Sequence, residues 1–116
     1  MNRTKKIAPN YMDTVFLPNP DRPWHRSRDG KIVIDVENRG IHHRIAQKIW
    51  HKPKVSHISL DAYGSALWEC MNGSNTVYDI VMAMKEQFPQ EEDRMLDRVV
   101  TFLGTLQNNR FIIKKK

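Results

Sequence analysis

Residues 55–88 constrain the fold most, because they hold a strand, two helices and the turn between them in one unbroken pattern. Residues 55–60 are rich in β-branched side chains and too short a run before Asp61 to form a helix, which predicts a strand. Asp61 is a good N-cap for a first helix. Its apolar face recurs at helical spacing as Leu60, Tyr63, Leu67, Trp68 and Met71, and Gly73 ends it.

A second helix opens at Thr76, which forms a capping-box pattern with Asp79 three residues later. Pro89 ends this helix, whose apolar face is Val77, Ile80, Val81, Met84 and Phe88. Two consecutive amphipathic helices with a short polar turn are typical of a helical hairpin or helix-turn-helix unit. Both nucleic-acid binders and peptide binders use such a unit.

The residues before this stretch predict a hairpin and a short helix. Asp29-Gly30 is a strong two-residue turn signal, and the alternation of Ile32, Ile34 and Val36 with polar residues predicts a β-hairpin over residues 24–37. Isoleucines four residues apart predict a short basic helix over residues 41–50, which Pro53 closes.

After Pro89, acidic residues suit the start of a third helix, whose dipole favours negative charge there. They are Glu91, Glu92 and Asp93, and the apolar face that follows is Leu96, Val99, Leu103 and Leu106. We expect Gly104 to permit close helix packing and Asn109 to take a left-handed cap before a short strand at residues 111–113.

The order of elements predicts an α+β protein, and 116 residues with 40% hydrophobic content suit one domain. Residues 1–22 are expected to form an extended N-terminal arm, residues 23–113 the domain, and residues 114–116 a basic tail. Four apolar residues are expected to pin the arm to the core: Tyr11, Val15, Phe16 and Leu17.

The net charge of +6 is concentrated in the front half, where residues 1–56 hold 12 Lys/Arg against 5 Asp/Glu. Such a basic surface attracts acidic partners, whether phosphate backbones or acidic peptides. The chain has a single cysteine, Cys70, which excludes an internal disulfide and indicates a reducing compartment. We expect Cys70 to be a buried packing residue. With no signal-peptide pattern and no apolar run long enough for a membrane span, we expect a cytoplasmic protein without membrane attachment.

No catalytic or metal-binding pattern is present in the sequence. The five histidines include one adjacent pair, His42 and His43, but adjacent helical side chains point about 100° apart and cannot both face one metal. The glycines are isolated, the serines lack a nucleophile elbow, and Glu91–Asp93 suit a solvated helix start. We therefore expect no enzyme, no metal site and no cofactor.

The order of several short motifs resembles that of the PqqD-like family, the peptide-recognition domains of ribosomal peptide modification systems. The motifs are Leu60-Asp61, Asn72-Gly73, Thr76-Val77-x-x-Ile80 and Phe102-Leu103-x-x-Leu106, within residues 58–113. The resemblance implies a winged-helix-like domain in which a three-stranded N-terminal sheet precedes three helices. In this chain a short helix is inserted between strands.

The resemblance also implies a function, a site and partners. The leader segment of a precursor peptide would add as a strand to the sheet edge and lie against the third helix, for presentation to a radical-type modifying enzyme. Whether the cofactor pyrroloquinoline quinone (PQQ) is the product stays open. Carried onto this sequence, the peptide-binding residues are Val55, Ser56, His57, Ile58, Ser59, Arg94, Arg98 and Phe102.

Two alternatives remain at this stage. A winged-helix DNA-binding protein would fit the helix-turn-helix pattern and the positive charge, although the acidic start of the third helix would repel phosphates. The other alternative is a subunit that only supports a larger partner. The oligomeric state is left open by the sequence.

Overall fold

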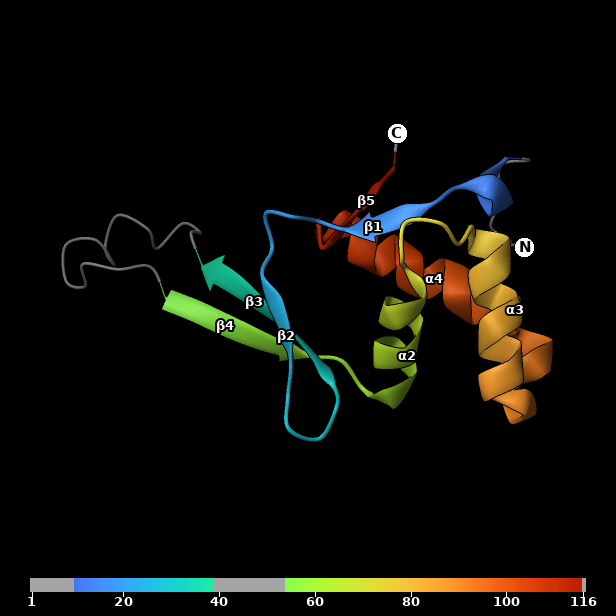
Figure 1. The fold of residues 1–116 in the computed structure, drawn as a ribbon, viewed down its shortest axis with the longest axis horizontal. Helices are drawn as coiled ribbons and strands as arrows, with labels where there is room; N and C mark the ends of the chain where they lie inside the picture. The colour runs from blue at the N-terminus through green and yellow to red at the C-terminus, as the bar shows by residue number, and fades with distance from the viewer. Residues whose placement is uncertain (1–9, 39–53, 116) are drawn as a thin grey trace. The chain divides into compact units, whose positions relative to one another are not determined.

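The computed structural model describes residues 10–38 and 54–115, which contain both helices and strands (Figure 1). The expected α+β class is confirmed. The described residues form two compact units. The first unit consists of residues from Pro20 to Ser65, and the second unit consists of the residues up to Asn19 and from Ala66 onward. In chain order the elements are η1 (Tyr11–Asp13), β1 (Phe16–Pro18), β2 (Trp24–Arg26), β3 (Ile32–Asn38), β4 (Lys54–Ser59), α2 (Ala62–Cys70), α3 (Val77–Gln87), η2 (Pro89–Arg94), α4 (Met95–Asn108) and β5 (Ile112–Lys114).

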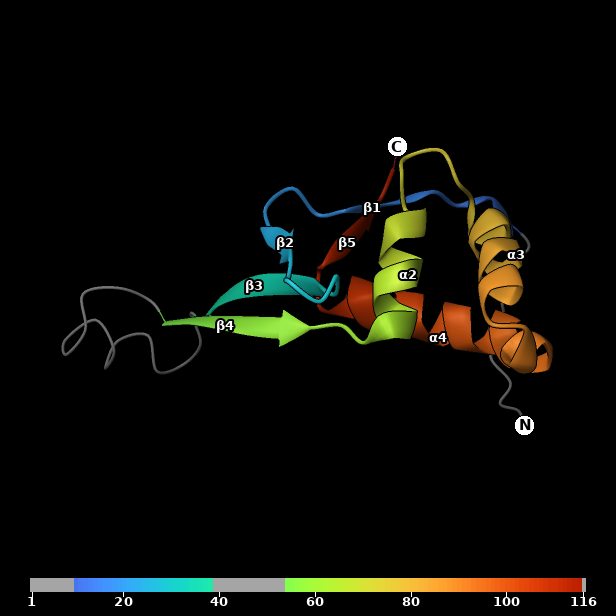
Figure 2. The same ribbon diagram turned by 60° about the horizontal axis from the view of Figure 1, so that its bottom comes forward.

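The first unit is built on an antiparallel three-stranded sheet in the order β2-β3-β4 (Figure 2). β2 and β3 form the expected hairpin, and β3 continues beyond it to pair along the whole of β4. Because side chains alternate along a strand, β3 has two different faces. Ile32 and Ile34 are fully buried on one face, whereas Asp35 on the other face keeps 26% of its side chain exposed. The second face can therefore carry charge.

The hairpin turn is one residue longer than the two-residue turn that Asp29-Gly30 predicted. Ser27 N donates to Lys31 O at 2.8 Å, and this bond encloses residues 28–30. Gly30 lies in the left-handed region with φ of +87°, which glycine adopts without the steric cost of a Cβ. The turn signal thus marked the right place but not the right length.

The expected starts of the two helices before and after Gly73, α2 and α3, are both confirmed. Asp61 Oδ1 accepts a hydrogen bond from Gly64 N at 2.8 Å at the start of α2. Thr76 Oγ1 accepts from Asp79 N at 3.1 Å while Asp79 Oδ2 accepts from Thr76 N at 2.9 Å, so the capping box of α3 is complete. The buried face of α3 consists of Val77, Ile80, Val81 and Met84.

The start of the third helix differs from the expectation. The acidic residues 91–93 lie in the 3-10 helix η2, and α4 begins after it at Met95. Leu96, expected on the buried face, is 41% exposed, and Met95 is fully buried instead. The tighter 3-10 turn sets the rotation at which α4 starts, so the buried stripe runs through residues 95, 99, 103 and 106.

The second unit contains a small sheet that the sequence did not predict, in which β1 pairs antiparallel with β5. Phe16 is fully buried, as expected of a residue that pins the N-terminal segment to the core. The pairing continues past the strands, because Asn19 N donates to Phe111 O at 2.9 Å. The described N-terminal residues are therefore held by the C-terminal strand.

Two further expectations for the end of the chain were wrong. Arg110, with φ of 62°, takes the left-handed position that was expected for Asn109. An added Cβ at Gly104 would meet no heavy atom within 4 Å among the described residues, so this glycine is not needed for close packing. The expected helix over residues 41–50 lies outside the described residues.

Candidate functional site

β4 is an edge strand of the three-stranded sheet. Its residues pair antiparallel with β3 in continuous register, from Val33 opposite Ser59 to Asn38 opposite Lys54. Among residues 10–38 and 54–115, no strand pairs with the other side of β4. Five of the eight expected peptide-binding residues thus lie on one exposed strand edge: Val55, Ser56, His57, Ile58 and Ser59.

The phase of the β3–β4 ladder decides which backbone groups of β4 point to the open side. Leu60 N donates to Ile32 O at 2.8 Å, and in an antiparallel pair such bonded pairs alternate with non-bonded ones. The amides of Ser56 and Ile58 therefore point to β3. The amides and carbonyls of residues 55, 57 and 59 point outward.

The neighbouring ladder gives the same phase independently. Asp35 N donates to Pro23 O at 2.9 Å, and Ser27 N donates to Lys31 O at 2.8 Å, so the odd-numbered residues of β3 bond toward β2. The even-numbered residues of β3 must then bond toward β4. Both ladders leave the odd-numbered residues of β4 as open donors and acceptors.

The side chain of His57 is part of a charged cluster on the polar face of the sheet. His57 Nδ1 lies 2.6 Å from Asp35 Oδ1, and His25 Nδ1 lies 3.5 Å from Asp35 Oδ2. The two imidazole rings meet edge to face with centroids 6.5 Å apart. The hydrogen bond from His57 is the main reason that the pKa of Asp35 lies below its ordinary value of 3.8. The carboxylate is therefore held in its charged form between two imidazoles.

Ser65 fixes the end of β4, a role that the sequence did not reveal. Its side chain is buried, and Ser65 Oγ accepts from Ile32 N at 2.9 Å while donating to Leu60 O at 3.3 Å. The hydroxyl thereby completes the last rung of the β3–β4 ladder. A serine in a helix carries no sequence signal for this bridge, because one of its two partners, Ile32, lies 33 residues away in the chain.

The three remaining expected site residues lie at η2 and α4, in the second unit. Arg94 ends η2 and is exposed, rather than lying on the helix as expected. Arg98 Nη1 lies 3.0 Å from Glu91 Oε1, so this guanidinium already contacts a carboxylate of its own chain. Phe102, one turn after Arg98, is half-buried. An acidic ligand at Arg98 would have to compete with Glu91.

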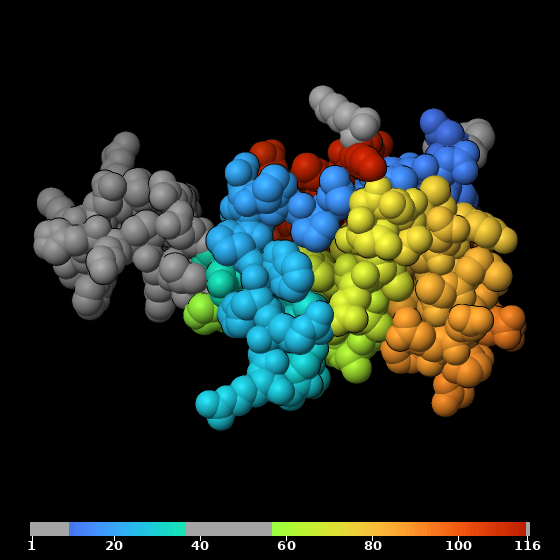
Figure 3. Space-filling model, in the orientation of Figure 1, coloured from blue at the N-terminus to red at the C-terminus, as the bar shows by residue number. Residues whose placement is uncertain are grey.

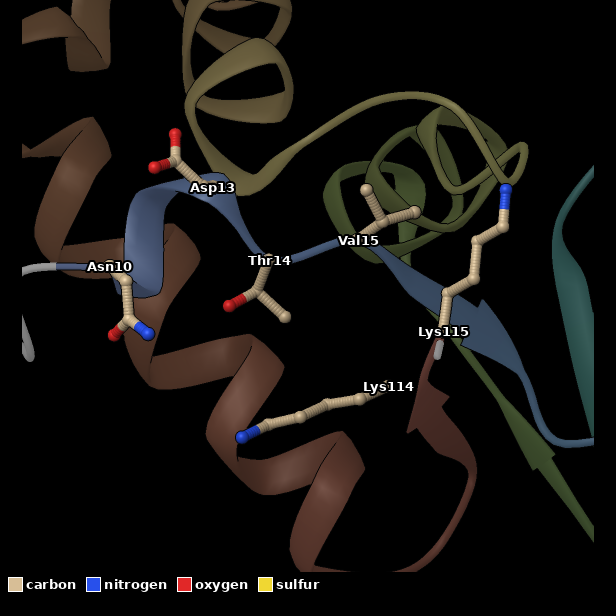
Figure 4. Close-up of a pocket in the computed structure, with 6 residues that line it drawn as sticks. All are labelled: Asn10, Asp13, Thr14, Val15, Lys114 and Lys115. Atoms are coloured by element: carbon tan, nitrogen blue, oxygen red, sulfur yellow. The ribbon is translucent and has the colours of Figure 1, made fainter.

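The second unit also has a hollow of about 460 Å³ between the η1–β1 segment and the end of β5 (Figure 4). Lys114 and Lys115 extend from its C-terminal side in different directions. Lys115 Nζ donates to Gly73 O at 2.7 Å, whereas Asp13 and Thr14 line the opposite side. The hollow is open, and its lining mixes charged and polar side chains with the apolar Val15, so it does not select a ligand by itself.

A smaller hollow of about 380 Å³ lies beside α3 and includes Met82, Glu86 and Glu92. Two large apolar side chains on this helix are exposed, Tyr78 and Met82. Figure 3 shows α3, in gold to orange, at the surface of the second unit. This helix face is open in the described residues.

The described residues hold no group of three or more His, Cys, Asp or Glu side chains that could bind a metal ion. Cys70 is half-buried, and burial, together with the charge of Glu69, raises the pKa of its thiol above 9.0. This environment disfavours the thiolate that a nucleophilic cysteine needs. No helix within residues 10–38 and 54–115 is long and apolar enough to cross a membrane.

These features combine an α+β fold with an open strand edge that lies beside the charged side chain of Asp35. The family model for coenzyme PQQ synthesis protein D (PqqD) matches residues 33–112, which include β3 from Val33 onward, β4 and all three α-helices of the described chain. The chain belongs to this family. No curated protein and no solved structure matches it.

Family membership gives the coarse function. PqqD proteins are non-catalytic accessory proteins with a peptide-binding role linked to PQQ and related ribosomal peptide biosynthesis. Membership implies interaction with a precursor peptide and a biosynthetic enzyme. The alternative of a winged-helix DNA-binding protein receives no support from the family match.

Proposed function

We propose that this chain captures the leader segment of a ribosomally made precursor peptide as an added strand on the open edge of β4. The observation that carries the proposal is the ladder phase, which gives residues 55, 57 and 59 outward amides and carbonyls. In strand addition, main-chain hydrogen bonds supply affinity and alternate side-chain positions supply specificity. Val55, Ser56, His57, Ile58 and Ser59 form the receiving strand.

The opposite edge of the sheet is a weaker candidate. β2 spans only Trp24–Arg26, whereas β4 spans Lys54–Ser59. A short edge strand limits the number of backbone bonds that an added strand can make, which is one way proteins protect sheet edges. The longer edge of β4 therefore favours a peptide ligand there.

A second set of contacts in the proposal comes from Arg94, Arg98 and Phe102. Arg94 is exposed, and Arg98 is 38% exposed beside Glu91, so both can meet an acidic peptide side chain. Exposed ion pairs are individually worth about 0–1 kcal/mol and act mainly on encounter rates. Arg94→Glu and Arg98→Glu should each weaken binding of an acidic peptide modestly, and more at low salt than at high salt.

The bound leader would be presented to a modifying enzyme of the radical type. The winged-helix-like arrangement implied by the family resemblance is part of this proposal. Strand addition recognises the leader segment alone. It therefore does not depend on which reaction follows on the rest of the peptide, or on whether PQQ is the product.

Amide hydrogen exchange followed by NMR tests the proposal residue by residue. The probe is a synthetic peptide with the leader sequence of the precursor peptide that this chain would bind. We expect the amides of Val55, His57 and Ser59 to exchange markedly more slowly when the peptide is bound. The amides of Ser56 and Ile58 should be protected with and without peptide, because they bond to β3.

A proline pair provides the matched mutational test. His57→Pro removes an outward donor and should weaken peptide binding, with His57→Gln as the control for loss of the imidazole. Ser56→Pro removes a ladder donor and should destabilise the sheet. Peptide binding that leaves exchange at residues 55, 57 and 59 unchanged would rule out strand addition at β4.

A further inference from the structure

The cluster of His25, Asp35 and His57 lies beside the position that an added strand would occupy, and the inference drawn from it rests on the proposed function. Asp35 is directly opposite His57 in the β3–β4 register, and His25 reaches the same carboxylate from β2. The imidazole of His57 is 63% exposed, compared with 26% for the Asp35 side chain. His57 is therefore the member of the cluster that a ligand at the edge meets first.

Strand geometry fixes where the ligand side chain would lie. The backbone groups of His57 point outward, so in an added antiparallel strand one residue would pair directly with His57. Directly paired residues place their side chains on the same face, with Cβ atoms about 4.5–5.5 Å apart. The side chain of that ligand residue would continue the row that begins with Asp35 and His57.

The contact between His57 and Asp35 determines what His57 offers to this side chain. Nδ1 is directed at Asp35, which leaves Nε2 as the other polar atom of the ring. The separation of 2.6 Å is slightly shorter than the charge-assisted N–H···O bonds, typically about 2.7–2.9 Å, that an imidazolium makes with a carboxylate. In the imidazolium form, Nε2–H is a hydrogen-bond donor, so the ligand side chain must provide an acceptor.

We propose that the ligand residue paired with His57 is an aspartate or glutamate, and that His57 binds its carboxylate as an imidazolium held in place by Asp35. His57 is then a specificity-determining residue of the peptide site, and Asp35 is a positioning residue. Peptide binding would strengthen at lower pH, because a protonated imidazole attracts a carboxylate.

The sign of the pH dependence follows from the charges on this face. The structure places two titratable groups against His57, namely Asp35 of β3 and His25 of β2. With both imidazoles neutral the cluster has a charge of −1 and repels a carboxylate. Protonation of one or both makes it neutral or positive, while the ligand carboxylate stays ionised above about pH 5.

The experiment measures the dissociation constant of the synthetic leader peptide at pH 5.5 and pH 8.0 by fluorescence anisotropy. The ligand residue paired with His57 is identified from NMR contacts across the new strand. A second peptide replaces that residue with its amide counterpart, Asp→Asn or Glu→Gln. We expect the acidic peptide to bind on the order of 5-fold tighter at pH 5.5 than at pH 8.0, and the amide peptide to show little change.

Two variants of the chain distinguish the role of His57 in ligand specificity from the role of Asp35 in positioning the imidazole. His57→Gln should abolish the difference in pH dependence between the two peptides. Asp35→Asn should reduce the difference, because the imidazolium loses its orienting partner. Rescue by a conservative change is expected for Asp35→Glu, which restores the carboxylate.

The outcomes distinguish this inference from the proposed function. If β4 amides become protected but affinity is the same at both pH values, or rises with pH, the acidic-ligand inference is wrong and strand addition stands. The same holds if the residue paired with His57 is basic or apolar. If the peptide binds without protection at residues 55, 57 and 59, strand addition itself fails.

Discussion

Ser65→Ala should destabilise the protein by about 1–3 kcal/mol, the cost of leaving buried hydrogen-bonding groups unsatisfied. The hydroxyl of Ser65 accepts from Ile32 N at 2.9 Å and donates to Leu60 O at 3.3 Å, and only 6% of the residue is exposed. Alanine fits the same space but removes both bonds. Water cannot readily replace the hydroxyl at a position this buried, so Ile32 N loses its partner.

Urea denaturation followed by circular dichroism provides the measurement. The transition midpoint of Ser65→Ala should fall with little change in slope, because the same surface is exposed on unfolding. Ser74→Ala is the matched control, since Ser74 is exposed and should stay within about 0.5 kcal/mol of the parent protein. Equal midpoints for Ser65→Ala and Ser74→Ala would show that the hydroxyl does not hold the end of β4.

Three further changes have expected outcomes. Trp68→Ala should cost roughly 3–5 kcal/mol in urea denaturation, because the indole is only 2% exposed; a midpoint that barely moves would contradict this burial. Gly104→Ala should stabilise α4 by about 0.5–1 kcal/mol, because an added Cβ meets nothing within 4 Å; a lower melting temperature would refute the open space. In an NMR titration of side-chain carboxyl carbons, the pKa of Asp35 should lie below 3.8 and rise in His57→Gln; the stability it contributes is present above that pH and lost as the pH falls through the lowered pKa.

Features that depend on neighbouring residues in the chain could be predicted from the sequence. The N-cap Asp61 and the capping box of Thr76 and Asp79 need only a spacing of three residues, and both are confirmed. The hairpin needed only Asp29-Gly30 between alternating apolar residues. These contacts are local, so the amino-acid types at fixed offsets specify them.

Features that depend on residues distant in the chain could not be predicted in this way. The pairing of β1 with β5 joins two three-residue strands from the two ends of the described chain, and neither is long enough for a periodic signal. Met95 and Leu96 were indistinguishable by helical period until the 3-10 turn of η2 set where α4 begins. Ser65 likewise gained its role from strands β3 and β4.

The candidate site also combines a feature that the sequence predicts with one that depends on distant residues. The sequence located the receiving strand, but the choice between Ser56 and His57 as the outward donor depends on ladder phase, which inverts with a one-residue shift in register. The phase is fixed at one end by the bond from Leu60 N to Ile32 O and by Ser65 bridging the same two residues. It places the outward backbone groups and the exposed imidazole on the same residue, His57. A single residue can therefore contribute both the backbone bonds that bind any extended peptide and the side chain that selects among peptides.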